Sequence, residues 1–257
     1  MTDRPKKAFS GGKVFVPFLT CGDPNIETTE KLVLAMADAG ADLIELGVPF
    51  SDPTGEGPVI MSANIRALSA GVTVDDVFDM VARLRKKTDV PLAFMTYANV
   101  VFSRGTEEFV RRMARVGADA LILTDVPLEE KDEFALPCAR AGIKYVSIVS
   151  PASSERVDLI TRRAEGFVQF MSPLGVADEI GGICTDIAEA ARRINAAGLP
   201  CIADSEISTS EQAKRMSGIC DGVVVGSAIV RLIAEHGEDC VPYVTELVKA
   251  MKSAVRG

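Results

Sequence analysis

The sequence predicts a single (β/α)8 barrel, a closed ring of eight parallel strands with helices on the outside. Eight short apolar runs alternate along the chain with longer amphipathic stretches. Several of these runs are almost continuously hydrophobic, as strands that are covered on both faces must be. No break in composition divides the 257 residues. We therefore expect one α/β barrel domain over residues 1–257.

The eight apolar runs are the predicted strands. They lie at 14–20, 42–47, 91–97, 119–125, 144–150, 166–172, 199–204 and 221–227. An open, doubly wound sheet is the alternative arrangement of such strands. No G-x-G-x-x-G motif opens a helix in this chain, which counts against the dinucleotide site that often accompanies that fold.

The stretches between these runs have helical periodicity, with apolar residues at i, i+3 or i+4, and i+7. They lie at 28–40, 73–87, 106–117, 130–142, 153–166, 186–198 and 209–218. Thr73, Thr106, Ser153 and either Ser208 or Thr209 are the expected N-caps. The string AGADLIEL at 39–46 returns as VGADALIL at 116–123, each time a helix end followed by a strand. Such an echo is typical of a repeated structural unit.

The composition excludes several classes of function. The net charge is −8 and the longest basic run is 85–87, which counts against nucleic-acid binding. No signal peptide and no apolar segment of about 18 residues is present, so we expect no membrane contact and a cytoplasmic location. The six cysteines form no C-x-x-C pair, and His236 is the only histidine. A multi-histidine metal site is therefore ruled out, and we expect neither metal nor cofactor.

The ends of the predicted strands direct attention to three places, because barrel active sites lie at the carboxyl ends of the strands. Glu45 ends an apolar strand, where burial would raise the pKa of its carboxyl and suit it to proton transfer. A structural pairing with a buried donor is the alternative. Glu56, in the following loop, either adds a second acid or is simply solvated. Gly226 and Ser227 begin a helix after the last strand, where phosphate is often bound.

Several longer strings carry a family resemblance. FVPFLTCGDP, IELGVPFSDP, DALILTDVPLEE and GVVVGSAIV occur in this order, from about residue 13 to the C-terminal helix. With these strings the chain resembles the tryptophan synthase α subunit family. The resemblance implies a cofactor-independent carbon–carbon lyase of the aldolase type, which cleaves indole-3-glycerol phosphate to indole and glyceraldehyde 3-phosphate in tryptophan biosynthesis. It also implies a pyridoxal-phosphate β subunit as partner.

The resemblance assigns roles to particular positions. Glu45 falls at the general acid–base, and Phe18 at a substrate-side aromatic residue. Glu56 falls where the family carries an aspartate that stabilises charge at the indole nitrogen. Gly226 and Ser227 fall in one of the phosphate-binding turns.

Other positions depart from the family's pattern. The remaining substrate-binding candidates are Tyr97, Gln169, Asp178, Ser205 and Glu206. The chain has GVAD, with Asp178, in place of GVTG, and DSEIS in place of GFGIS. Carboxylates beside a phosphate dianion would repel it. Replacing aromatic side chains by Gln169 and Ser205 would also remove apolar walls from an indole site.

Three functions remain open at this point. We favour a diverged lyase that uses Glu45 on a related, non-standard small molecule, in a polar pocket that includes Asp204. The second is an ordinary α subunit that supplies indole to a β subunit. The third is a non-catalytic activator of a β subunit, which a functionally silent Glu45→Gln substitution would favour.

Overall fold

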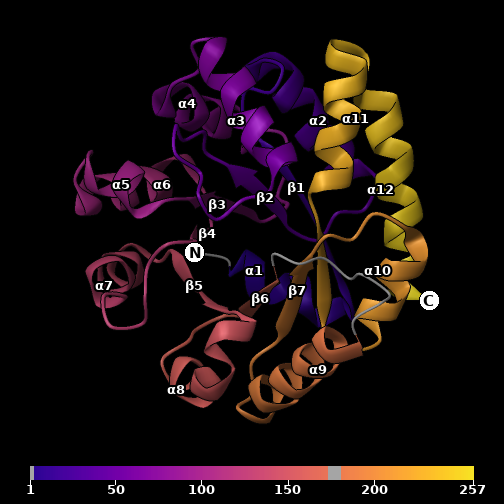
Figure 1. The fold of residues 1–257 in the computed structure, drawn as a ribbon. Coiled ribbons are helices and arrows are strands. Elements are labelled where there is room, and N and C mark those ends of the chain that lie inside the picture. Colours follow the sequence, from indigo (N-terminus) through magenta and orange to yellow (C-terminus); the bar gives the residue numbers. More distant parts are fainter. Residues whose placement is uncertain (1–2, 173–180) are drawn as a thin grey trace.

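The computed structural model describes residues 3–172 and 181–257, and it confirms the barrel. Each strand runs parallel to its neighbours in the order β1 to β8, and β1 pairs with β8 to close the ring. Figure 1 shows the helices arranged around the strands. The strands are β1 Val14–Thr20, β2 Ile44–Gly47, β3 Leu92–Thr96, β4 Ala120–Leu123, β5 Lys144–Val149, β6 Val168–Ser172, β7 Cys201–Ser205 and β8 Gly222–Val225.

The helices include the seven stretches with helical periodicity, the helix expected at Gly226 and Ser227, and several that the sequence does not predict. They are α1 Arg4–Ala8, α2 Ile26–Asp38, α3 Pro58–Ser69, α4 Val74–Leu84, α5 Ala98–Phe102, α6 Thr106–Val116, α7 Asp132–Ala141, α8 Val157–Arg162, α9 Gly181–Ala196, α10 Ser210–Ser217, α11 Ser227–His236 and α12 Val241–Arg256. Three short 3-10 turns are η1 Phe9–Gly11, η2 Pro151–Arg156 and η3 Gly237–Asp239. Within the described ranges, no helix combines the length and apolar character needed to cross a bilayer.

Two of the expected helix caps are confirmed and two are wrong. Thr73 and Thr209 each cap a helix and form a reciprocal capping box. Thr106 is instead the first residue of α6, whose N-cap is Gly105. Ser153 lies inside η2, where its hydroxyl donates to the Ser150 carbonyl at 3.0 Å, so its side chain stabilises a local turn rather than the start of α8.

The barrel interior is formed by alternate residues of each strand. Its apolar members include Val16, Ala93, Ile122, Val146, Ile202 and Val224. The intervening strand residues pack outward against the helices in a second, larger cluster. Phe9 closes the amino end of the strands, since its ring lies 5.5 Å from that of Phe167. Polar side chains interrupt this apolar interior only towards the carboxyl end, where the candidate site lies.

Candidate active site

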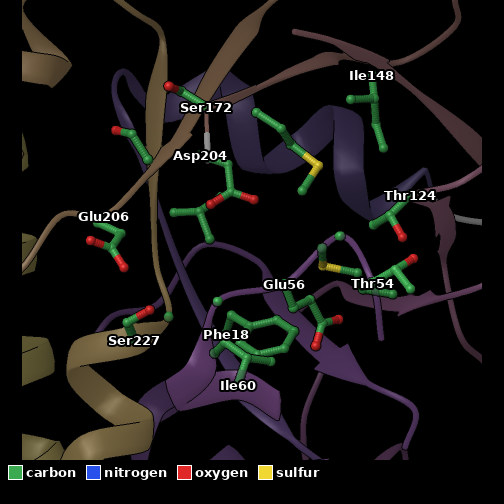
Figure 2. A pocket seen from close by; sticks show the side chains of 17 residues that line it. Phe18, Thr54, Glu56, Ile60, Thr124, Ile148, Ser172, Asp204, Glu206 and Ser227 are labelled. Atoms are coloured by element: carbon green, nitrogen blue, oxygen red, sulfur yellow. The ribbon is translucent and has the colours of Figure 1, made fainter. Parts of the chain in front are cut away.

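A cavity of about 470 Å³ opens at the carboxyl ends of the strands. Its lining comes from almost every strand end and from the loop that follows β2. Figure 2 shows Glu206 and Ser227 on one side of this pocket and Glu56 on the other, with Asp204 between them. Among the described residues that line it, none is Lys, Arg or His. The pocket therefore combines carboxylates, hydroxyls and apolar side chains without a balancing cation.

The ring of Phe18 forms part of the pocket wall, as the sequence predicts. Two glycines make room for it. A Cβ atom on Gly47 would lie 2.7 Å from the Phe18 Cζ, and one on Gly226 would lie 3.2 Å from its Cδ1. Larger residues at either position would push the ring out of place, so these glycines fix one face of the site.

Glu45 lies inside the barrel, in register with Phe18 on β1 and Ala93 on β3. Its side chain is fully buried and does not itself line the pocket. Within the described chain neither carboxyl oxygen has a hydrogen-bond partner. Burial raises the pKa of Glu45 well above its usual value, and the nearby charge of Asp204 raises it further. The amide of Gln169 lowers this pKa somewhat, although it does not reach hydrogen-bond geometry with either oxygen.

Glu56 projects from the loop after β2 and lines the pocket. Its Oε2 accepts a hydrogen bond from Asn64 Nδ2 at 3.0 Å. Burial raises the pKa of Glu56 to about 7, against the opposing effect of hydrogen bonds from Asn64 and Tyr97. The loop is therefore not a freely solvated turn, and the two acids predicted at this end of the barrel both have raised pKa values.

Tyr97 supports this loop from behind instead of lining the cavity. Its hydroxyl accepts a hydrogen bond from the Gly55 backbone N–H at 3.1 Å. Its ring stacks on Phe50, with 5.1 Å between the ring centroids. Tyr97, which the sequence predicts to bind substrate, thus positions the neighbouring residues Gly55 and Phe50, and through them Glu56.

Gln169 also lies behind the lining, fully buried among the inward residues of β6. Its Nε2 donates a hydrogen bond to Asp204 Oδ2 at 2.9 Å. Asp204 is half-buried and does line the pocket. Burial raises the pKa of Asp204 to about 6, while the hydrogen bond from Gln169 opposes that rise.

The opposite side of the pocket carries the predicted phosphate turn. Gly226 is the N-cap of α11 and Ser227 its first residue, and both line the cavity, so the N-terminus of that helix borders the pocket. Ser205 and Glu206 from the end of β7 line the same side. Glu206 is exposed, and Ser205 is buried with a hydroxyl that has no partner in the part of the chain that the structure describes. Asp178 lies outside the described residues.

Several lining residues were not singled out from the sequence. Ser172 at the end of β6 and Thr124 just after β4 line this region, and neither hydroxyl has a hydrogen-bond partner within residues 3–172 and 181–257. Both follow the general rule that strand ends supply the site, yet a serine or threonine there carries no distinct sequence signal. Buried polar atoms of this kind normally find partners, so they indicate space for a polar ligand.

Comparisons with known proteins agree across the whole chain. The family model for the tryptophan synthase alpha chain matches residues 6–256. The tryptophan synthase alpha chain of Lacticaseibacillus casei is 39% identical over 251 residues, covering 96% of this chain and 93% of that protein. The corresponding protein of Geobacter sp. (strain M21) is 40% identical over 248 residues, covering 95% and 93%.

Solved structures of tryptophan synthase alpha subunits are also similar to this chain over nearly its full length. Tryptophan synthase subunit alpha from Legionella pneumophila superimposes with a TM-score of 0.90 at 31% identity, covering 100% of this chain and 99% of that one. A chain from the tryptophan synthase complex of Pyrococcus furiosus superimposes with a TM-score of 0.86 at 30% identity, covering 94% and 99%.

Proposed function

The chain belongs to the tryptophan synthase alpha chain family, and we propose that it is an ordinary α subunit, which cleaves indole-3-glycerol phosphate to indole and glyceraldehyde 3-phosphate. Family membership makes it a carbon–carbon lyase. The sequence alone favoured a related, non-standard substrate, and the comparisons favour the ordinary reaction instead, since the relatives match at about 40% identity over nearly their full length. The single observation that carries the proposal is a buried, unpartnered carboxyl, Glu45, beneath a pocket at the strand ends.

Glu45 is suited to act first as an acid. Its raised pKa keeps the carboxyl neutral at pH values where an ordinary glutamate is ionised. Rotation towards the pocket breaks no hydrogen bond, because neither oxygen has one. In the proposed reaction the carboxyl protonates C3 of the indole ring. The resulting carboxylate then accepts the proton of the side-chain hydroxyl, the carbon–carbon bond breaks, and its electron pair restores the aromatic ring while the hydroxyl carbon becomes the aldehyde.

Glu56 supports this step through its charge. Protonation at C3 places positive charge on the indole nitrogen, and a nearby carboxylate stabilises it. With a pKa of about 7, Glu56 becomes mostly ionised above that pH. We therefore expect activity to rise as the pH passes through about 7, and to fall at higher pH as Glu45 loses its proton.

The phosphate would lie against the N-terminus of α11, at Gly226 and Ser227. The sequence suggested that acidic residues nearby oppose this binding. The structure supports a smaller effect, because Glu206 is exposed and water screens its charge. Asp204, for its part, is held towards the barrel interior by Gln169. Among the described residues, the helix N-terminus thus competes against one screened carboxylate, Glu206, on its own side of the pocket.

We also propose that a pyridoxal-phosphate β subunit binds the chain, as the sequence resemblance implies. Phe102, at the end of α5, is a large aromatic side chain that is 62% exposed. It follows β3, one of the strands whose loops contact the β subunit in this family. An exposed aromatic residue is a common anchor of protein interfaces.

The test is steady-state release of indole from indole-3-glycerol phosphate, with and without a β subunit. Glu45→Gln should lower kcat by about 10²–10⁴-fold, the usual contribution of general acid–base catalysis, while the protein stays folded. Glu246→Gln, on the exposed side of α12, is the matched control and should have full activity. A folded wild-type protein without activity would restore the diverged-substrate hypothesis. Activation of a β subunit that is unchanged in Glu45→Gln, with no indole released by either protein, would favour a non-catalytic partner.

A further inference from the structure

Two polar side chains lie at inward positions of the barrel on adjacent strands, one in the lining of the pocket and one behind it. Gln169 is on β6 and Asp204 on β7, where the strand register pairs Met171 with Asp204. Their hydrogen bond of 2.9 Å joins a fully buried amide to a carboxyl that lines the pocket. These are also two of the positions at which the chain departs from the family's usual residues, an aromatic and a glycine. Because the changed residues contact each other, they form one unit.

The orientation of the Gln169 amide is informative. Its Nε2 donates to Asp204, and its Oε1 has no partner among the described residues. The two carboxyl oxygens of the nearby Glu45 likewise have none there. An amide that donates to one carboxyl stabilises the ionised form of that carboxyl. The arrangement therefore favours a charged Asp204, and an acceptor oxygen of Gln169 remains unsatisfied in the buried region that contains Glu45.

The charged groups near Glu45 that the structure describes are acidic. Asp204 faces Glu45 from β7, and Glu56 approaches from the loop after β2, with Tyr97 behind that loop. No cationic side chain is found among the described residues of the pocket lining. Carboxyl groups that share an apolar region cannot all ionise at low cost, because like charges repel strongly where water is excluded.

We propose that Asp204 is a positioning residue for Glu45. The negative charge of Asp204, which Gln169 holds in place, keeps the carboxyl of Glu45 protonated in the free enzyme. Glu45 thus begins each cycle as an acid. The direction of the Glu45 pKa agrees with this proposal, since burial raises that pKa and the charge of Asp204 raises it further. The kinetic consequence rests on the proposed lyase activity, whereas the location of the proton does not.

The direct test measures the proton on Glu45 without any substrate. The infrared carboxylic-acid band of Glu45, assigned by its loss in Glu45→Gln, is followed through a pH titration in the wild type and in Asp204→Asn. We expect the midpoint to fall by about one pH unit or more in Asp204→Asn, a tenfold loss of proton affinity. Asp204→Glu retains the charge and should keep the midpoint high. Asp79→Asn, at a side chain that is 71% exposed on α4, removes the same charge at the surface and should change nothing.

Each result of this titration either supports or overturns the proposed role of Asp204. A midpoint that is the same in the wild type and in Asp204→Asn overturns the proposal, whatever happens to stability. If Asp204→Asn does not fold, Asp204→Gly carries the same expectation, with glycine as the residue usual in the family. A merely structural role would change the melting temperature and leave the midpoint where it was.

Kinetics provide the second readout. In the pH profile of kcat/KM, the falling limb assigned to Glu45 should move to lower pH in Asp204→Asn. The rising limb assigned to Glu56 should move less, because Asp204 is the weakest of the influences on its pKa. If the wild type releases no indole, the proposed function fails, and the infrared titration still decides the role of Asp204.

Discussion

Three aspartates at the amino end of the barrel and the buried Glu45 at its carboxyl end differ in how they are paired. At the amino end, Asp42, Asp119 and Asp221 each precede a strand and accept a hydrogen bond from the backbone of a neighbouring strand. The donors are the N–H groups of Phe15 at 2.7 Å, Leu92 at 2.9 Å and Cys201 at 2.9 Å. At the carboxyl end, Glu45 has no hydrogen-bond partner among the described residues.

Cations complete the amino end. Asp119 pairs with Arg4 at 3.1 Å and with Arg85 at 3.0 Å. Asp42 pairs with Lys252, and Asp221 lies 3.9 Å from Lys13. The pocket lining that the structure describes has no cation at all. The difference shows that identical chemical groups stabilise the fold where they are paired and remain available for proton transfer where they are not.

The largest effect, on the free energy of unfolding, is expected when a paired acid is removed. Asp119→Ala should lower the free energy of unfolding by about 3–5 kcal/mol, because it leaves the largely buried Arg85 and the Leu92 N–H without their partner. Urea denaturation measures this loss, and the activity of the protein that remains folded should be unchanged. Asp89→Ala is the control, since Asp89 pairs with Arg4 but its side chain is 92% exposed. That change should cost less than about 1 kcal/mol. Equal losses in the two variants would contradict the comparison.

Removing the unpaired acid, Glu45, tests the same comparison from the other side. The folded-state pKa of Glu45 is raised, so the folded protein retains a proton that the unfolded chain releases, and stability is lost as the pH rises above about 4.5. Glu45→Gln removes this loss. We expect its melting temperature to exceed that of the wild type by about 2–4 °C at pH 8, which corresponds to about 1 kcal/mol, and by less at pH 5. A calorimetric difference that is the same at both pH values would show that Glu45 is not held neutral by the fold.

The burial of each element explains whether the sequence could predict it. All eight strands were predicted because both of their faces are apolar, so each run is recognisable without its neighbours. Helix α3 was missed, since Met61, Ile65 and Leu68 are exposed and blur its helical pattern. The positions of Glu45 and Glu56 in the site followed from the rule that strand ends supply it.

The contacts within the site could not be predicted in this way. Gln169 and Asp204 are 35 residues apart and meet through the register of β6 and β7. Tyr97 was placed at the site by its strand, yet the chain turns there into α5 and the ring stacks on Phe50. Such partners depend on how neighbouring strands align, and a single sequence does not record this alignment.

The smallest expected effect concerns the exposed acid at the phosphate side. Glu206→Gln should lower KM for indole-3-glycerol phosphate by about two- to fivefold, the range of a charge interaction at an exposed site. The difference should shrink at high salt, because salt already screens the wild-type repulsion. Glu235→Gln, exposed near the far end of α11, removes the same charge away from the pocket and serves as control. A change in KM of tenfold or more that persists at high salt would mean that Glu206 faces the phosphate in a site with little water. Its repulsion of the phosphate would then be stronger than that of an exposed side chain.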